Sequence, residues 1–223
     1  MIKARTEFAD VSPSVAYDVL HDPQYRLIWD KYMMGAKDVG LLNPNNDVCY
    51  YALRSFPPFR HRDFVLQRSW LDLGDEKLIF SHSICHDDFP PKPNCIRATV
   101  FLTGYLIRRL GDDGCQVTYF THSDPKGKLP SWMVNRLTKI VAPKVIKRLH
   151  QACLAYPAWK SQHGPDWKPW SHPEQQMNMS RVRVEHCRAR AYDQETVDES
   201  GCVDAASQKA AEAEEEAEEA EEA

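Results

Sequence analysis

Arg26 and Asp30 lie four residues apart in the stretch HDPQYRLIWDKYMM (residues 21–34), a spacing that places both on one face of a helix. A guanidinium group presents a planar fork of donors that fits phosphate oxygens, and a neighbouring carboxylate can orient it. The same spacing also occurs in surface ion pairs, which contribute only about 0.3–0.5 kcal/mol. From these residues alone, both a buried anion site and a surface salt bridge remain open.

Other residue types that could perform chemistry give a weaker signal. His82, Cys85 and His86 are metal-ligand types, but alternation along a strand puts the two histidines on one face and the cysteine on the other, which argues against a shared ion. The chain has no G-x-S-x-G elbow, no phosphate-binding glycine loop and no zinc-protease helix motif. We therefore expect no catalytic residue, no metal and no cofactor.

Charge and cysteine content bear on the class of protein. The chain has 223 residues and a net charge of −4, yet residues 204–223 hold eight Glu, one Asp and one Lys, so the rest is mildly basic. Seven cysteines, no apolar run of membrane-spanning length and no apolar signal at the N-terminus favour free thiols in the cytoplasm. After residue 175 the chain becomes polar and then acidic, which predicts a solvated tail over 176–223 behind one domain, residues 1–175.

The elements before residue 125 read as two helices followed by a meander. Ser12 as a cap and Pro13 at the first helical position predict a helix over 12–22, and residues 25–34 predict a second, short one. Runs rich in Val, Ile, Tyr and Phe, separated by short turn signals, predict antiparallel hairpins. The expected strands are 37–43, 47–56, 62–73, 77–85, 95–110 and 115–124.

Residues 129–156 predict one long helix. Apolar residues recur there at helical spacing and define a single face, whereas Lys139, Lys144, Lys147 and Arg148 lie largely off that stripe. Pro143 should kink the helix midway. A curved antiparallel sheet that wraps this helix would bury both apolar faces and would tend to leave a cavity between them.

Four motifs in this order carry a family resemblance over residues 2–175: YRLIWD, FPPFRHRDFV, CIRATVFLTGYLI and DPKGKLPSWMVNRLTKIVAPK. They resemble the START (StAR-related lipid transfer) domain family, and most of all its phosphatidylcholine-transfer branch. The resemblance implies an α+β helix-grip fold, in which a curved antiparallel sheet grips a long C-terminal helix around one lipid. The family domain begins with a helix and two strands that have no counterpart after Met1, so we expect this chain to lack those elements.

The resemblance also implies roles for individual residues. Arg26 would bind the lipid phosphate, oriented by Asp30, which favours the anion site over the surface salt bridge. Tyr51, Phe64 and Phe101, with Thr103, match the positions of a headgroup cage, where aromatic faces attract a quaternary ammonium. This set would accept choline and need not exclude ethanolamine. Taken singly, the aromatic residues also suit an ordinary core.

The long helix is implied to open against the bilayer. Trp132 and Met133 would then form part of a membrane-docking gate, together with Lys139, Lys144, Lys147 and Arg148. Trp159, Trp167 and Trp170, which lie beyond residue 156, are expected to pack back onto the domain rather than to anchor in the membrane.

Two functions from different classes remain. The first is an intracellular carrier that binds one phosphatidylcholine or phosphatidylethanolamine as cargo and transfers it between membranes, with transient peripheral contact at the membrane surface. Such a carrier makes and breaks no bond, so it would not be an enzyme, and it needs no nucleic acid. The second is a truncated START fragment that does not transfer lipid and acts as a regulatory or protein-interaction module.

Overall fold

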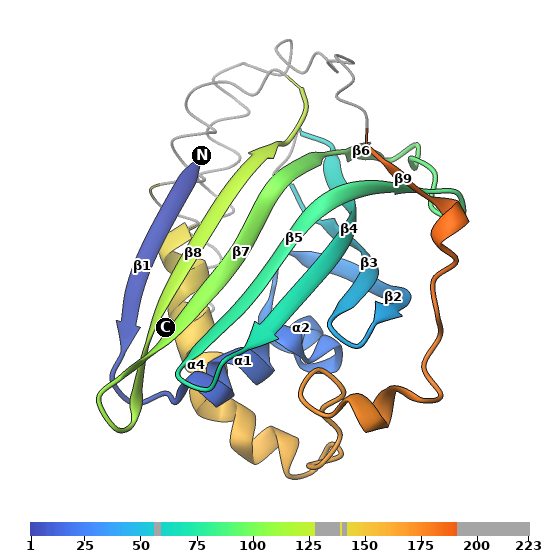
Figure 1. Ribbon diagram of the computed structural model, residues 1–223. Coiled ribbons are helices and arrows are strands. Elements are labelled where there is room, and N and C mark those ends of the chain that lie inside the picture. Colours follow the sequence, from blue (N-terminus) through green and yellow to red (C-terminus); the bar gives the residue numbers. More distant parts are fainter. Residues whose placement is uncertain (56–58, 128–138, 140–141, 191–223) are drawn as a thin grey trace.

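The computed structural model describes residues 1–55, 59–127, 139 and 142–190 (Figure 1). Trp132, Met133 and the acidic tail lie outside the described residues, and so do residues 140–141, so the expected kink at Pro143 falls at the edge of the described chain.

Nine strands of the described chain form one curved sheet (Figure 1). Their main path runs β1-β8-β7-β5-β4-β3-β2 and is antiparallel throughout, which confirms the predicted meander. The strands are β1 Ile2–Phe8, β2 Met33–Asn43, β3 Asn46–Leu53, β4 His61–Asp72, β5 Glu76–His86, β6 Cys95–Arg97, β7 Thr99–Leu110, β8 Gly114–Asp124 and β9 Cys187–Ala189. Strand β6 pairs with β4 and β9 pairs with β5, off the main path.

The first helix begins at its predicted cap, and the second begins two residues earlier than predicted. Helix α1 (Pro13–His21) begins at Ser12, whose hydroxyl accepts a hydrogen bond from the Val15 amide at 3.3 Å. Helix α2 (Pro23–Trp29) is capped by Asp22. The expectation of a helix up to residue 34 is wrong, because the chain leaves the helix after Trp29 and β2 begins at Met33.

Helix α4 (Ala142–Lys160) lies with α1 and α2 on one face of the sheet, and the strands curve around the three helices (Figure 1). The main core fills the space between these layers. From α4 it takes Leu149, Ala152 and Tyr156, which belong to the predicted apolar face, and also Cys153. This arrangement is the expected helix-grip fold, with the sheet enclosing the long helix.

A second core lies on the opposite face of the sheet. Val48, Tyr50 and Val65 alternate along β3 and β4 with residues that face the helices, and all three are buried. Val182 and Cys187 from residues 177–190, here named the C-terminal segment, pack against them. Composition assigns this segment to the tail. In the structure, however, its backbone forms hydrogen bonds with Leu41 of β2, and its last residues form strand β9.

Candidate functional site

A cavity of about 120 Å³ lies between the helices and the concave face of the sheet. Side chains from α1, α2, β2–β5, β7 and β8 line it. Of the residues expected to bind a lipid headgroup, Arg26, Tyr51 and Thr103 are part of this lining. The short helix α2, held at its start by the Asp22 cap, carries Arg26 into this lining, opposite the strands that supply most of the other lining groups.

Arg26 is a cation whose hydrogen bonding is incomplete. One terminal nitrogen, Nη2, lies 3.4 Å from Asp30 Oδ2, whereas its Nε is buried and has no hydrogen-bond partner in the described structure. Burial alone would lower the pKa of Arg26, but Tyr105, Asp30 and Tyr51 nearby outweigh it, and the pKa is raised above its ordinary value. The guanidinium therefore stays charged with a donor still to satisfy.

The expected headgroup residues are only partly brought together. The Tyr51 ring stacks on Phe64, with centroids 4.8 Å apart, and Phe64 is buried behind it. The Thr103 hydroxyl donates to the Phe120 carbonyl at 3.2 Å. Phe101 is not among the described residues that line the cavity. It lies at a register shift between β7 and β8, is 38% exposed, and its ring contacts His122.

The basic residues expected at the gate vary in exposure. Lys139 and Lys147 are exposed, whereas Lys144 and Arg148 are half-buried. The Arg148 guanidinium lies 5.4 Å from the centroid of the Tyr32 ring. A cation–π contact of this kind holds the charge against the domain rather than away from it.

The three C-terminal tryptophans differ in burial. Trp170 is buried and donates to Asp18 Oδ1 at 2.7 Å. Trp159 lies within α4 and contacts the Tyr25 ring at 4.8 Å, whereas Trp167 is half exposed. Two of the three therefore pack back onto the domain.

Three polar residues in the cavity wall, His21, Asp38 and Arg68, escaped the sequence analysis, as did Asp47, which pairs with one of them. Arg68 on β4 forms a two-pronged ion pair with Asp47, its direct partner on β3. Asp38 and His21 line the cavity together with Arg68. Burial raises the pKa of the Asp38 carboxyl. Only the register of β3 against β4 puts Asp47 opposite Arg68, and no turn signal in the sequence sets this register.

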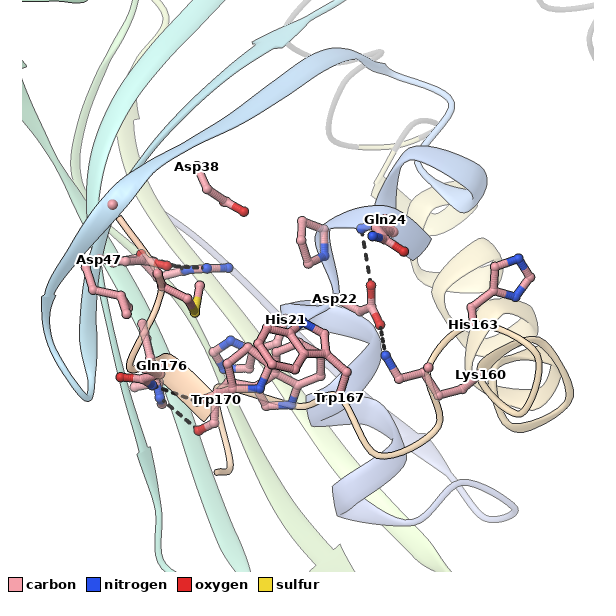
Figure 2. Close-up of a pocket in the computed structure, with 18 residues that line it drawn as sticks. His21, Asp22, Gln24, Asp38, Asp47, Lys160, His163, Trp167, Trp170 and Gln176 are labelled. Atoms are coloured by element: carbon pink, nitrogen blue, oxygen red, sulfur yellow. Dashed lines mark hydrogen bonds and ion pairs between the residues drawn. The ribbon is translucent and has the colours of Figure 1, made fainter. Parts of the chain in front are cut away.

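A second cavity of about 460 Å³ adjoins the first (Figure 2). The two share His21, Pro23, Asp38 and Arg68, so this group separates them. At its far wall the Lys160 ammonium lies 2.8 Å from Asp22 Oδ2. This buried contact ties the end of α4 to the junction of α1 and α2, and it thereby fixes the helix that carries Arg26.

His21 should make the protein less stable in acid. Its ring is buried against Tyr17, Trp70 and Trp170. Burial, with a smaller effect of the Arg68 charge, holds the pKa of His21 well below its usual 6.5. Below about pH 6.5 the unfolded chain binds a proton that the folded chain does not. The free energy of unfolding should then fall by up to about 1.4 kcal/mol per pH unit.

Urea unfolding at a series of pH values between about 5 and 7.5 measures this effect in wild type and in His21→Gln. Other titrating groups contribute to both proteins, so the difference between the two slopes isolates His21. The variant should lose less stability per pH unit than wild type. Equal slopes would show that His21 is not held neutral by the fold.

Comparison with known proteins shows the family to which this fold belongs. The model of the START domain family matches residues 1–160. The chain belongs to this family. It is 40% identical over 212 residues to START domain-containing protein 10 of Homo sapiens, covering 93% of this chain and 72% of that protein. It is 30% identical over 152 residues to phosphatidylcholine transfer protein of Bos taurus, covering 66% of this chain and 70% of the relative.

Solved structures agree with the family assignment. The crystal structure of human STARD10 superposes on this START domain with a TM-score of 0.81 at 40% identity, covering 86% of this chain and 78% of that one. The lipid transfer and protein localization domain of human StarD13 gives a TM-score of 0.58 at 28% identity, covering 67% and 75%. In the described part of the chain, no helix is both long and apolar enough to span a membrane.

Proposed function

We propose that this START domain is a phospholipid carrier. It binds one phosphatidylcholine or phosphatidylethanolamine in the cavity between helices and sheet, and it moves this lipid between membranes during transient contact with their surfaces. The names of its relatives support lipid transfer, since they include a phosphatidylcholine transfer protein. The proposed site of action is the cytoplasm.

The incomplete hydrogen bonding of Arg26 carries this proposal. An arginine in a cavity wall whose Nε is buried without a described partner leaves a charged donor unsatisfied, which costs about 1–3 kcal/mol or more. A phosphodiester supplies the missing acceptor and the opposite charge in one group. Asp30, 3.4 Å from the Arg26 Nη2, keeps the guanidinium oriented while the phosphate takes its free edge.

The aromatic pair Tyr51–Phe64 supports a choline or ethanolamine headgroup. A ring face attracts a quaternary ammonium, which has no proton to donate. Tyr51 also brings a hydroxyl, and Thr103 lies in the same cavity wall, so the ammonium of ethanolamine would find acceptors there. The site therefore suits both lipids. Phe101, which lies outside the lining, would join the cage only after a local rearrangement of the β7 bulge.

The cavity must enlarge to hold a lipid. Its volume of about 120 Å³ is below the roughly 300–1,000 Å³ of typical ligand sites. The adjoining cavity of about 460 Å³ offers space for acyl chains once the side chains of Arg68 and His21 move aside.

Lipid transfer requires no bond to be made or broken, and Asp30, which could act as an acid or base, is already engaged by Arg26. We therefore propose a carrier, not an enzyme.

Transfer between vesicles tests the proposal. Donor vesicles carry a self-quenched fluorescent phosphatidylcholine or phosphatidylethanolamine, and acceptor vesicles carry none. Added protein should raise the rate of dequenching in proportion to its concentration. A folded protein that leaves this rate at the protein-free value for both lipids would refute the carrier and favour the regulatory or protein-interaction module.

Tyr51→Ala should weaken binding of choline lipids more than that of phosphatidic acid. The change removes one aromatic face, and a desolvated cation–π contact contributes about 2 kcal/mol, or roughly 30-fold in affinity. Phosphatidic acid has no ammonium and should lose far less. Competition between the two lipids for the protein measures the ratio directly. Equal losses for both would mean that Tyr51 only packs the wall.

A further inference from the structure

Three side chains of metal-ligand type meet outside the lipid cavity, where the end of β5 contacts the C-terminal segment. His86 is the last residue of β5, Asp88 lies two residues after it, and His186 directly precedes β9. Each of the three offers one ligand atom within 4.8 Å of the other two. The Asp88 Oδ2 atom lies 3.7 Å from His186 Nδ1. The sequence argues against a site built from His82, Cys85 and His86, and it does not show that residue 186 returns to this strand.

The backbone holds these residues in place from both sides. Strand β9 pairs with β5 so that His86 faces Cys187, which brings the preceding His186 to the end of β5. The Asp87 amide donates to the His186 carbonyl at 3.1 Å, and the Phe89 amide donates to the His86 carbonyl at 3.0 Å. The two histidines and the aspartate are therefore close before any ion arrives.

The His86 ring is held in place by a hydrogen bond and by packing. The Asp88 amide donates to His86 Nδ1 at 3.2 Å, so this nitrogen carries a lone pair and no proton. This lone pair is taken up by the backbone N–H of Asp88, so Nδ1 would bind an ion only by giving up this hydrogen bond. The His86 ring itself is buried and held edge-on against Phe89 and His186. An ion would replace one long hydrogen bond at an otherwise fixed imidazole.

We propose that His86, Asp88 and His186 bind a Zn²⁺ ion. Two imidazole nitrogens and one carboxylate oxygen are a donor set that suits zinc, with water in the fourth position, and imidazole does not suit Mg²⁺ or Ca²⁺. Bond lengths of about 2.0–2.1 Å in a tetrahedron place ligand atoms roughly 3.3 Å apart. The Asp88–His186 pair, at 3.7 Å, needs only a small closure, and the Asp88 side chain is 68% exposed and has room to turn inwards. The other pairs of ligand atoms, all within 4.8 Å, must close by up to about 1.5 Å.

The bound ion would fasten the C-terminal segment to the sheet. Val182 and Cys187 of this segment cover the core formed by Val48, Tyr50 and Val65, yet β9 has only three residues. A metal that joins β5 to His186 closes the segment over this core. Because the unfolded chain lacks the assembled site, zinc should raise the melting temperature and protect amides of the segment from exchange.

Zinc titration of the whole, tag-free, reduced chain after chelator treatment tests the site. We expect one Zn²⁺ per chain, at least tenfold weaker binding in His186→Asn, and unchanged binding in His172→Asn. His172 is the matched control, because its Nδ1 also lies near a carboxylate, 3.2 Å from Glu174 Oε1, but outside the proposed site. His186 is a safer position than the buried His86, and the metal-free melting temperature of each variant checks its fold. No zinc binding tighter than about 100 μM would overturn the site.

Cobalt distinguishes this site from a thiolate site, since the chain has seven cysteines. One Co²⁺ held by nitrogen and oxygen should give visible d–d bands without a sulfur-to-metal charge-transfer band, and the bands should disappear in His186→Asn. A charge-transfer band that Cys187→Ser removes would assign the ion to cysteine and contradict the proposal. Amide exchange in residues 177–190 must also slow with zinc in wild type and not in His186→Asn.

Discussion

Arg26→Gln should lose at least nine-tenths of the phospholipid that wild type retains through purification. Glutamine keeps most of the side-chain volume and removes the charge that faces the cavity. A charge-assisted hydrogen bond contributes about 1.5–3 kcal/mol, which corresponds to roughly 10- to 150-fold in affinity. The Asp30 carboxylate, 10% exposed and left without its cation, would further oppose a phosphate. Extraction of the purified protein and phosphate analysis measure the retained lipid.

The matched control is Arg108→Gln. Arg108 also pairs with an acid, since its Nε lies 2.7 Å from Glu76 Oε1, but this pair is exposed at the surface of the sheet. The control should keep its lipid and lose little stability. If Arg26→Gln retained as much lipid as the control, Arg26 would be an ordinary salt-bridge partner and the phosphate site would be wrong.

Asp63→Ala should lower the free energy of unfolding by about 3–5 kcal/mol. The Asp63 side chain is fully buried and accepts two hydrogen bonds from Arg97, at 2.8 and 2.9 Å. Arg97 also donates to the carbonyls of Phe89 and Pro90, so it anchors the loop between β5 and β6. Loss of the carboxylate leaves a buried guanidinium without its counter-charge. Chemical denaturation followed by tryptophan fluorescence measures the change.

Asp75→Ala separates burial from the loss of an ion pair as such. Asp75 pairs with Arg109 at 2.6 Å, but both side chains are exposed. Its removal should cost less than about 1 kcal/mol. Similar losses in the two variants would mean that the Asp63–Arg97 pair does not depend on its buried surroundings.

Local signals in the sequence were enough for most elements. Ser12 and Pro13 mark the start of α1 because a cap and a first-turn proline act within one turn of the chain. Short turns between apolar runs fix neighbouring strands as hairpins. Strand β1 was missed although charged Lys3, Arg5 and Glu7 alternate with less exposed residues, a pattern typical of a half-buried strand.

Features that depend on register or on distant segments could not be predicted. Phe101 is turned out of the cavity lining by a bulge, in which β7 has one more residue than the facing stretch of β8. No turn residue in the sequence marks this bulge. Asp47 meets Arg68 only through strand register. The C-terminal segment is polar, and only its few apolar residues, such as Val182, find a core on the far face of the sheet.

Native mass spectrometry of the purified chain, followed by lipid identification after denaturation, tests the central claim most directly. The account predicts a folded protein with one bound phospholipid per chain, phosphatidylcholine or phosphatidylethanolamine, released together with loss of the fold. A folded chain that carries no lipid, and takes up none after incubation with vesicles of these two lipids, would contradict the carrier and leave Arg26 and Asp30 as a structural ion pair.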